Sequence, residues 1–195
     1  MRPRIVVGIT GASGAIYAQR FIELAIQLDV ELAIIPSRSA LDLLGFELEA
    51  PDGHWMAKLE IDPKKRERIV VHDASDFSAG PASGTYRADG MIIIPCSMKT
   101  LAAVAHGYAD TLLTRCADVQ LKERRPLVIV PRESPVSTIH LENMLTLARA
   151  GASIVPACPP FYHHPRSIVE LVDAIVHKAL AQIGLHHPNA YEWNG

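Results

Sequence analysis

A glycine-rich turn near the start of the chain has the composition of an anion-binding site. Residues 8–17 read Gly-Ile-Thr-Gly-Ala-Ser-Gly-Ala-Ile-Tyr and follow an apolar run at 4–7 that predicts a buried strand. The residues at 15–27 have helical composition. Free backbone N–H groups and a helix N-terminus, placed around one turn, favour a bound anion such as phosphate. Thr10 and Ser13 can add hydroxyl donors.

The glycine spacing alone leaves the ligand open. The pattern is G-x-x-G-x-x-G, whereas the dinucleotide-binding fingerprint is G-x-G-x-x-G. It is not a Walker loop, because no lysine follows the last glycine. An ordinary tight turn between a strand and a helix would have the same composition.

Similar polar turns occur after three more predicted strands. The segments 36–39, 95–100 and 131–135 each follow an apolar run and contain serine, and the first two also open a predicted helix. Ligands of parallel α/β sheets bind beyond the carboxyl ends of the strands, near the switch in strand order. The turns therefore predict one ligand site along that edge.

The alternation of apolar runs and helical segments predicts the fold that positions these turns. We expect a three-layer, doubly wound parallel α/β sheet of the flavodoxin or Rossmann-like type, as a single domain over 1–195. The segment 51–68 is expected to be a surface excursion, and 186–195 a C-terminal tail that folds over the site. Ser167 and Glu170 predict a capping box at the start of the last helix. Six strands are expected, at 4–7, 31–36, 69–71, 91–94, 127–130 and 153–156.

Composition excludes several classes of protein. Of the 195 residues, 49% are hydrophobic and 21% charged, with a net charge of −2, so no nucleic-acid footprint is indicated. No apolar run reaches the roughly 20 residues that cross a bilayer, and the N-terminal one is too short for a signal peptide. The three cysteines form no C-x-x-C pair, which predicts reduced thiols in the cytoplasm. The nine histidines show no metal-ligand spacing.

The turns favour a mononucleotide over a dinucleotide. Several serine- and threonine-bearing turns suit a ligand with one phosphate. A dinucleotide site usually has an acidic residue about 20 residues beyond the glycines, on the ribose. Glu31 is near that distance but opens the second predicted strand instead of ending it. The residues therefore favour FMN over NAD.

Six blocks of the sequence resemble the UbiX family of flavin prenyltransferases. They cover nearly the whole chain in order, and the later blocks are specific to the family. The blocks are Gly-Ile-Thr-Gly-Ala-Ser-Gly-Ala at 8–15, Pro-Cys-Ser-Met-Lys-Thr-Leu at 95–101, Leu-Lys-Glu-Arg-Arg-Pro-Leu at 121–127, Val-Pro-Arg-Glu at 130–133, His-Leu-Glu-Asn-Met-Leu at 140–145 and Phe-Tyr-His at 161–163.

The resemblance implies a complete activity. A UbiX-type enzyme joins the dimethylallyl group of dimethylallyl monophosphate to N5 and C6 of reduced FMN and releases phosphate. The product, prenylated FMN, passes to a UbiD-type decarboxylase of aromatic acids, as in ubiquinone biosynthesis. The resemblance also implies a homo-oligomer, typically a dodecamer, with FMN bound where subunits meet. No nucleic acid or membrane partner is expected.

The resemblance also implies which residues form the site. The FMN phosphate side would be held by Gly11, Ala12, Ser13 and Ser37, and the flavin by Ser97, Met98, Lys99, Thr100 and Arg132. The dimethylallyl phosphate would be surrounded by Glu47, Arg115, Lys122, Glu133, Tyr162 and Lys178, with Trp193 over the prenyl group. Of these, Glu47, Lys122, Glu133, Tyr162 and Trp193 are the expected catalytic residues.

The chemistry needs residues of these types. A phosphate monoester leaves poorly, so cations such as Arg115, Lys122 and Lys178 must neutralise the departing oxygens. The ring of Trp193 can stabilise an allylic cation, and Glu133 or the released phosphate can move a proton. With no D-D-x-x-D cluster in the sequence, we expect a metal-independent transferase. Relatives carry arginine at position 178. Lysine lacks the planar guanidinium that binds a phosphate through two hydrogen bonds at once.

Other interpretations remain open on the residues alone. Lys122 lies near a predicted helix end, where cations complement the dipole, and Cys96 reads as a small buried hydrophobe. Flavin-dependent cysteine decarboxylases share this fold. They have a catalytic histidine, and His72 could be its counterpart in this chain. Pro81-Ala82-Ser83-Gly84-Thr85 departs from their Pro-Ala-Ser-Ala-Asn-Thr pattern. A flavin-binding carrier without its own chemistry is the third candidate.

Overall fold

The sheet is fully parallel and has six strands. The structure is a computed structural model that describes residues 2–50 and 52–191. The strand order is β3-β2-β1-β4-β5-β6, and every neighbouring pair is parallel. The predicted doubly wound fold and its six strands are confirmed. The strands are β1 (Arg4–Ile9), β2 (Glu31–Pro36), β3 (Ile69–Val71), β4 (Gly90–Cys96), β5 (Leu127–Pro131) and β6 (Ser153–Ile154).

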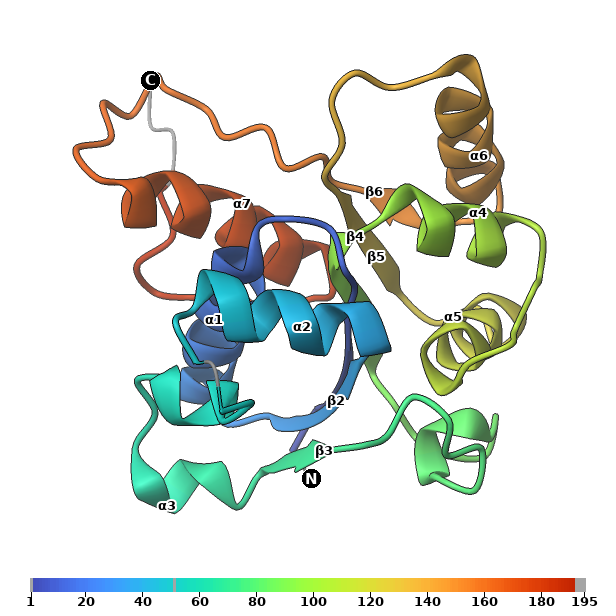
Figure 1. The fold of residues 1–195 in the computed structure, drawn as a ribbon, viewed down its shortest axis with the longest axis horizontal. Coiled ribbons are helices and arrows are strands. Elements are labelled where there is room, and N and C mark those ends of the chain that lie inside the picture. Colours follow the sequence, from blue (N-terminus) through green and yellow to red (C-terminus); the bar gives the residue numbers. More distant parts are fainter. Residues whose placement is uncertain (1, 51, 192–195) are drawn as a thin grey trace.

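Helices cover both faces of the sheet, as Figure 1 shows. One face carries α1, α2 and α7, and the other carries α4, α5 and α6. The longer helices are α1 (Ala15–Ala25), α2 (Arg38–Glu47), α4 (Met98–Ala105), α5 (Leu112–Lys122), α6 (Thr138–Arg149) and α7 (Ile168–Gln182). Shorter ones are α3 (Pro63–Arg66) and the 3-10 turns η1 (Ile26–Leu28), η2 (Trp55–Lys58) and η3 (Gly80–Ala82).

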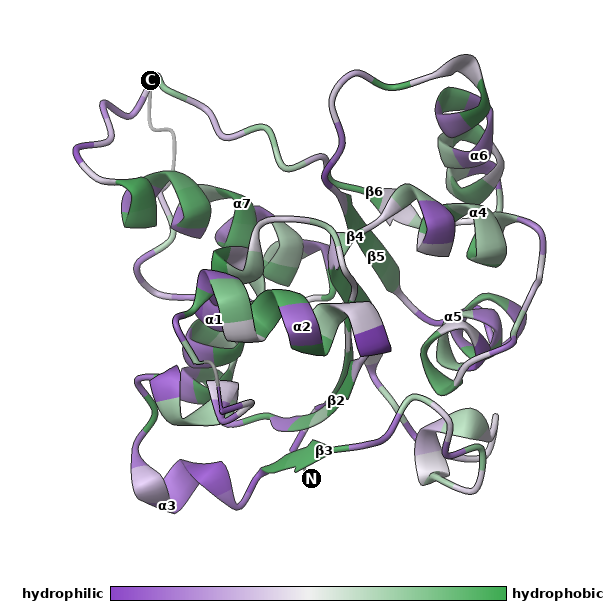
Figure 2. Ribbon diagram, in the orientation of Figure 1, coloured by the Kyte–Doolittle hydropathy of each residue, from purple (hydrophilic) through white to green (hydrophobic). Residues whose placement is uncertain are grey.

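The central strands are apolar on both sides because both faces are covered. All residues of β4 and β5 are buried, and Figure 2 shows most of β5 in green, the colour of hydrophobic residues. Side chains that alternate along each strand enter two separate cores. Ile92 and Val128 pack towards α1 and α7, whereas Ile93 and Ile129 pack towards α4 and α5. Such runs are typical of buried parallel strands.

Two predicted boundaries differ from the structure. Gly8 is the fifth residue of β1, paired with Ile35 and Ile93, so the turn begins only at Thr10. The segment expected as a surface excursion also contributes to the core. Trp55 is 4% exposed and packs with the α1 and α7 face.

The start of α7 follows the sequence signal only in part. The Ser167 hydroxyl accepts from the N–H of Glu170, as an N-cap does (3.2 Å). The Glu170 carboxylate, however, accepts from the N–H of Arg166 instead of from that of Ser167 (2.8 Å). The helix is therefore capped, but not by a reciprocal box.

Strands β1 and β4 are neighbours at the centre of the sheet and are also its switch point. The chain leaves β1 towards the α1 face and leaves β4 towards the α4 face. No crossover closes the edge between them, and in open parallel sheets the ligand crevice lies at the carboxyl ends of such a pair. The β1–β4 pairing runs only as far as Gly8 and Ile93. This edge is called the rim below.

Candidate functional site

The turns of the rim are tied to one another by hydrogen bonds. The Thr10 hydroxyl donates to the carbonyl of Pro95 (2.8 Å) and accepts from the N–H of Ser97 (2.7 Å). The N–H of Arg132 donates to the carbonyl of Cys96 (3.2 Å). The turns that follow β1, β4 and β5 therefore form one connected structure.

Two more bonds complete the rim. The N–H of Ser37 donates to the carbonyl of Ile9 (2.8 Å), which places the start of α2 beside the glycine turn. The Nε of Arg132 reaches across and donates to the carbonyl of Ser13 (2.8 Å). The structure thus brings together the predicted flavin residues from all four turns.

The glycine turn keeps donors available for an anion. Within the described residues, the backbone N–H groups of Gly11, Ala12 and Ser13 have no hydrogen-bond acceptor. Gly11 lies so close to α2 that a Cβ there would be 2.5 Å from the Ser39 hydroxyl. The Ser39 hydroxyl is in turn 3.2 Å from that of Ser37. N–H groups and hydroxyls therefore gather in the way a phosphate requires.

Glu47 occupies the N-terminus of α1. Its carboxylate accepts from the N–H groups of Gly14 (2.9 Å) and Ala15 (2.7 Å). Burial alone would raise the pKa of Glu47, but the Ser13 hydroxyl, these two N–H groups and the charge of Arg132 lower it overall. Glu47 is thus held as a carboxylate beside the glycine turn, where it complements the helix dipole.

The turn after β4 is also pre-formed. The Ser97 hydroxyl accepts from the N–H of Thr100 (3.3 Å) and lies 3.2 Å from the Thr100 hydroxyl, so Ser97 caps α4. Met98 and Thr100 are buried, while Lys99 is exposed. All four predicted flavin residues of this turn therefore begin one helix at the rim.

Two adjoining cavities lie beside the rim. One, of about 600 Å³, is lined by Met98, Arg132 and Glu133. The other, of about 690 Å³, is lined by Tyr162 and Lys178. Pro156 and Cys158 line both cavities, so the two adjoin at these residues. Glu133, Tyr162 and Lys178 are thereby placed on one side of the predicted flavin site.

Arg115 and Lys122 lie elsewhere in this chain. Both are on α5 and face the loop around η3. The Nε of Arg115 donates to the carbonyl of Ala82 (3.1 Å), and its guanidinium pairs with Asp118 (2.9 Å). Lys122 pairs with Glu123. Neither residue lines the cavities beside the rim, so a single chain does not bring Arg115 and Lys122 together with Tyr162 and Lys178.

The remaining residues named from the sequence are Trp193 and the cysteines. Trp193 lies outside the described residues. Within residues 2–50 and 52–191, no group of three potential metal ligands occurs, and no helix is long and apolar enough to cross a membrane. Cys96 is fully buried, and burial raises the pKa of its thiol. Cys116 and Cys158 are also free thiols.

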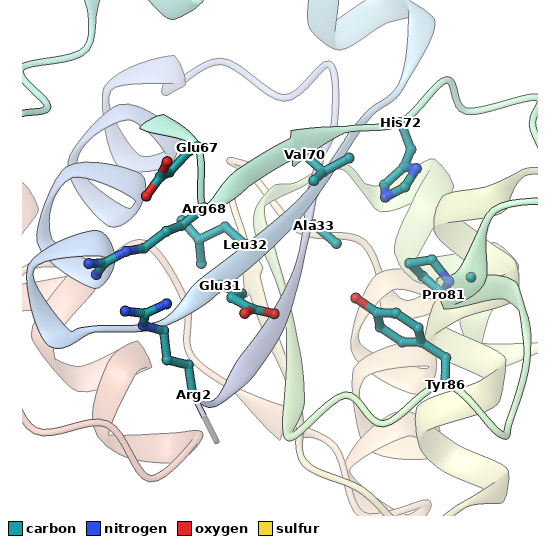
Figure 3. Close-up of a pocket in the computed structure, with 11 residues that line it drawn as sticks. Arg2, Glu31, Leu32, Ala33, Glu67, Arg68, Val70, His72, Pro81 and Tyr86 are labelled. Carbon is teal, nitrogen blue, oxygen red and sulfur yellow. The ribbon is translucent and has the colours of Figure 1, made fainter. Parts of the chain in front are cut away.

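A groove of about 500 Å³ lies on the sheet face of β2 and β3, apart from the cavities beside the rim. Figure 3 shows Arg2 and Arg68 at one end of it and His72 and Tyr86 at the other. Both arginines pair with Asp29. His72 therefore lines a groove at the edge strand and lines neither cavity beside the rim.

The prediction for one rim residue, Thr10, is wrong. Thr10 was expected to offer its hydroxyl to the ligand, but it is 1% exposed and bonds to the β4 turn. Its position directly after a buried strand was the signal available. The partner could not be read from the sequence, because Pro95 is 85 residues away.

Comparison with known proteins shows the family of the chain. The Flavoprotein family matches residues 1–181. A probable UbiX-like flavin prenyltransferase of Escherichia coli is 44% identical over 193 residues, covering 98% of this chain and 93% of the relative.

Solved structures give the same result. A crystal structure of AnUbiX in complex with FMN and dimethylallyl pyrophosphate is 42% identical, with a TM-score of 0.88, and covers 100% of this chain and 99% of that one. A dodecameric FMN-dependent UbiX-like decarboxylase from Escherichia coli O157:H7 is 42% identical, with a TM-score of 0.86, and covers 98% of this chain and 100% of that one. An FMN-dependent cysteine decarboxylase, at 13% identity and a TM-score of 0.61, shares the fold alone. The chain therefore belongs to the Flavoprotein family and, within it, to the UbiX-like flavin prenyltransferases.

Proposed function

We propose that this protein transfers a dimethylallyl group from a dimethylallyl phosphate to reduced FMN and so makes prenylated FMN. The observation that carries the proposal is the position of two adjoining cavities beside the rim, one of them lined by Arg132, which bonds to the glycine turn. An anion-binding glycine turn lies at one end, and Tyr162 and Lys178 lie in a cavity at the other. Full-length similarity to flavin prenyltransferases supports the same activity.

FMN fits the rim by the chemistry of its donors. Its phosphate side would be held by Gly11, Ala12 and Ser13, whose N–H groups have no other acceptor among the described residues, with Ser37 beside them. The flavin would lie against the turn at 97–100 and Arg132. FMN supplies the ring positions N5 and C6 that accept the dimethylallyl group.

Residues of the adjoining cavities would act on the second substrate. Lys178 would neutralise the departing phosphate, and the Tyr162 hydroxyl would donate to it. Glu133 is exposed in the neighbouring cavity. Its carboxylate can take the proton that is lost when the bonds to N5 and C6 close the new ring. Glu47, which lies beside the glycine turn, would act on the same substrate from the side where the flavin binds. Trp193 would cover the prenyl group.

Arg115 and Lys122 would enter this site from a neighbouring subunit. They lie on α5, remote from the cavities of their own chain. Several large apolar side chains are exposed in the single chain, including Phe46 (83%), Ile168 (71%) and Phe161 (68%). Such exposure is typical of surfaces that other subunits cover. We therefore propose a homo-oligomer, a dodecamer as in the similar structure, with shared sites.

The product would be consumed outside this protein. Prenylated FMN would pass to a UbiD-type decarboxylase, in the cytoplasm. The three free cysteines support a reducing compartment.

The proposal is tested by anaerobic incubation with reduced FMN and dimethylallyl monophosphate, followed by mass spectrometry of the released flavin. We expect the flavin to gain one five-carbon unit. A parallel reaction with dimethylallyl diphosphate shows which phosphate is preferred. If the flavin mass is unchanged with both donors, although the protein is folded and loaded with FMN, prenyl transfer is contradicted. The alternative, a flavin-binding carrier without its own chemistry, is then favoured.

A further inference from the structure

We propose that Thr10 is a positioning residue for the flavin, because its hydroxyl sets the width of the crevice between β1 and β4. It is the only side chain among the described residues that hydrogen-bonds directly between the β1 turn and the β4 turn. The inference rests on the proposed binding of FMN at the rim. It concerns how two flavin-binding turns are held in register, and it gives Thr10 no contact with the ligand.

The backbone cannot hold this point of the sheet unaided. The β1–β4 ladder ends at Gly8 and Ile93, and Pro95 has no N–H with which to continue it. Beyond that point the described residues show one backbone bond between the two strand ends, from the N–H of Thr10 to the carbonyl of Pro95, and it is long at 3.3 Å. The Thr10 hydroxyl adds a shorter bond to the same carbonyl (2.8 Å).

The hydroxyl acts on both sides of the crevice at once. It donates to Pro95 and accepts from the N–H of Ser97 at 2.7 Å, so both of its hydrogen-bonding roles are used. Ser97 is the residue that caps α4 and begins the turn at 97–100. One hydroxyl therefore fixes where that turn starts relative to Gly11, which follows Thr10 directly.

The third turn is coupled to the same point. Cys96 lies between the two residues that Thr10 contacts, and its carbonyl accepts from the N–H of Arg132. Arg132 then reaches back to the carbonyl of Ser13. A change in the position of 95–97 would thus shift the turns on both sides of the flavin.

The experiment compares Thr10→Val with Thr10→Ser. Valine keeps the size and branching but loses both hydroxyl bonds, whereas serine keeps the hydroxyl. We expect Thr10→Val to raise the Kd for FMN by about tenfold or more, and Thr10→Ser to remain near wild type. The measurement is FMN fluorescence quenching on titration, with the Tm of the flavin-free protein recorded alongside.

A matched control separates positioning from general loss of stability. Thr114 is also buried (5% exposed), and its hydroxyl bonds within the α5 cap to Thr111. Thr114→Val should lower the Tm with little change in the Kd for FMN. If Thr10→Val does not fold, Thr10→Cys, with a weaker donor and acceptor, should show an intermediate loss of affinity.

The outcomes are distinct. A Kd within twofold of wild type for Thr10→Val, or for Thr10→Cys where that variant is used, overturns the inference. So does an equal loss of affinity in Thr114→Val at the same change in Tm. Absence of FMN binding by the wild-type protein overturns the proposed function itself.

Discussion

At the scale of single residues, the rim shows how a carboxylate can lie in an anion-binding turn. Glu47 accepts two N–H groups of the first turn of α1, while the N–H groups of Gly11, Ala12 and Ser13 have no acceptor among the described residues. The carboxylate stabilises the helix end, and the earlier part of the turn remains available for phosphate. The family resemblance placed Glu47 near the substrate but did not predict this contact.

The charge of Glu47 should make stability depend on pH. Because the pKa of Glu47 is lowered in the fold, its contribution is present above its ordinary value of 4.5 and is lost as pH falls through the lowered pKa. Glu47→Gln should cost about 1 kcal/mol at pH 7, and this difference should shrink towards pH 3. Urea unfolding at pH 7, 5, 4 and 3 measures it.

Glu142→Gln is the control for this series, because Glu142 is exposed on α6 and its side chain makes no hydrogen bond within the described residues. It should leave the pH dependence of the wild-type protein unchanged. Parallel curves for wild type and Glu47→Gln from pH 7 to pH 3 would show that the carboxylate contributes no such charge effect.

At the scale of elements, two histidines join α7 to the segment that follows it. The rings of His177 and His187 stack at 5.1 Å with an interplanar angle of 20°. His187 accepts from the N–H of Asn189 through Nδ1 (3.3 Å), and its Nε2 lies 3.4 Å from the Gln27 amide oxygen. This pattern fits a neutral imidazole with its proton on Nε2. Burial lowers the pKa of both histidines, and each also lies near Asp173 and Arg20.

This contact should loosen in mild acid. Because the histidine pKa is lower in the folded protein, the unfolded segment binds protons at a higher pH than the folded one. The contribution of these histidines to stability is therefore fully present above about pH 6.5 and falls as the pH decreases below it. Protonation also places a hydrogen on Nδ1, where the Asn189 N–H donates. Hydrogen exchange should show a lower protection factor at Asn189 at pH 5 than at pH 7.5. In His177→Phe the repulsion between two charged rings is absent, so the decrease should be smaller. An unchanged protection factor at pH 5 in the wild-type protein would contradict the expectation.

At the scale of the whole molecule, the proposed site needs two chains. Tyr162 and Lys178 line a cavity beside the rim, whereas Arg115 and Lys122 face the η3 loop on the other side of the sheet. A monomer should therefore transfer no prenyl group. The exposed apolar side chains of α6, Ile139 and Leu141, provide surface for such an assembly.

Mixed assemblies test this division of the site. Lys122→Ala and Lys178→Ala should each be inactive alone, but co-expressed subunits should recover about a quarter of the sites, because each lysine then comes from a different chain. Activity is measured after tandem purification with two tags. Lys122→Ala mixed with the double variant should recover nothing. If the first mixture is also inactive, both lysines act within one chain or neither acts as proposed.

The sequence by itself determined the architecture. Runs such as 91–94 and 127–130 are apolar at every position, and only a strand buried on both faces requires this. Gly11, Ser37 and Ser97 could be assigned to one edge because parallel strands end there. Their local order in the chain carried enough information for the fold and for the placement of these turns at one edge of the sheet.

Only the tertiary structure decided how these residues cooperate. The bond of Thr10 to Pro95 spans 85 residues, and that of Arg132 to Ser13 spans 119. The separation of Lys122 from Lys178 likewise depends on which face of the sheet α5 and α7 cover. Hydrogen bonds depend on distances between atoms, and no periodicity in the sequence records the distances between segments so far apart in the chain.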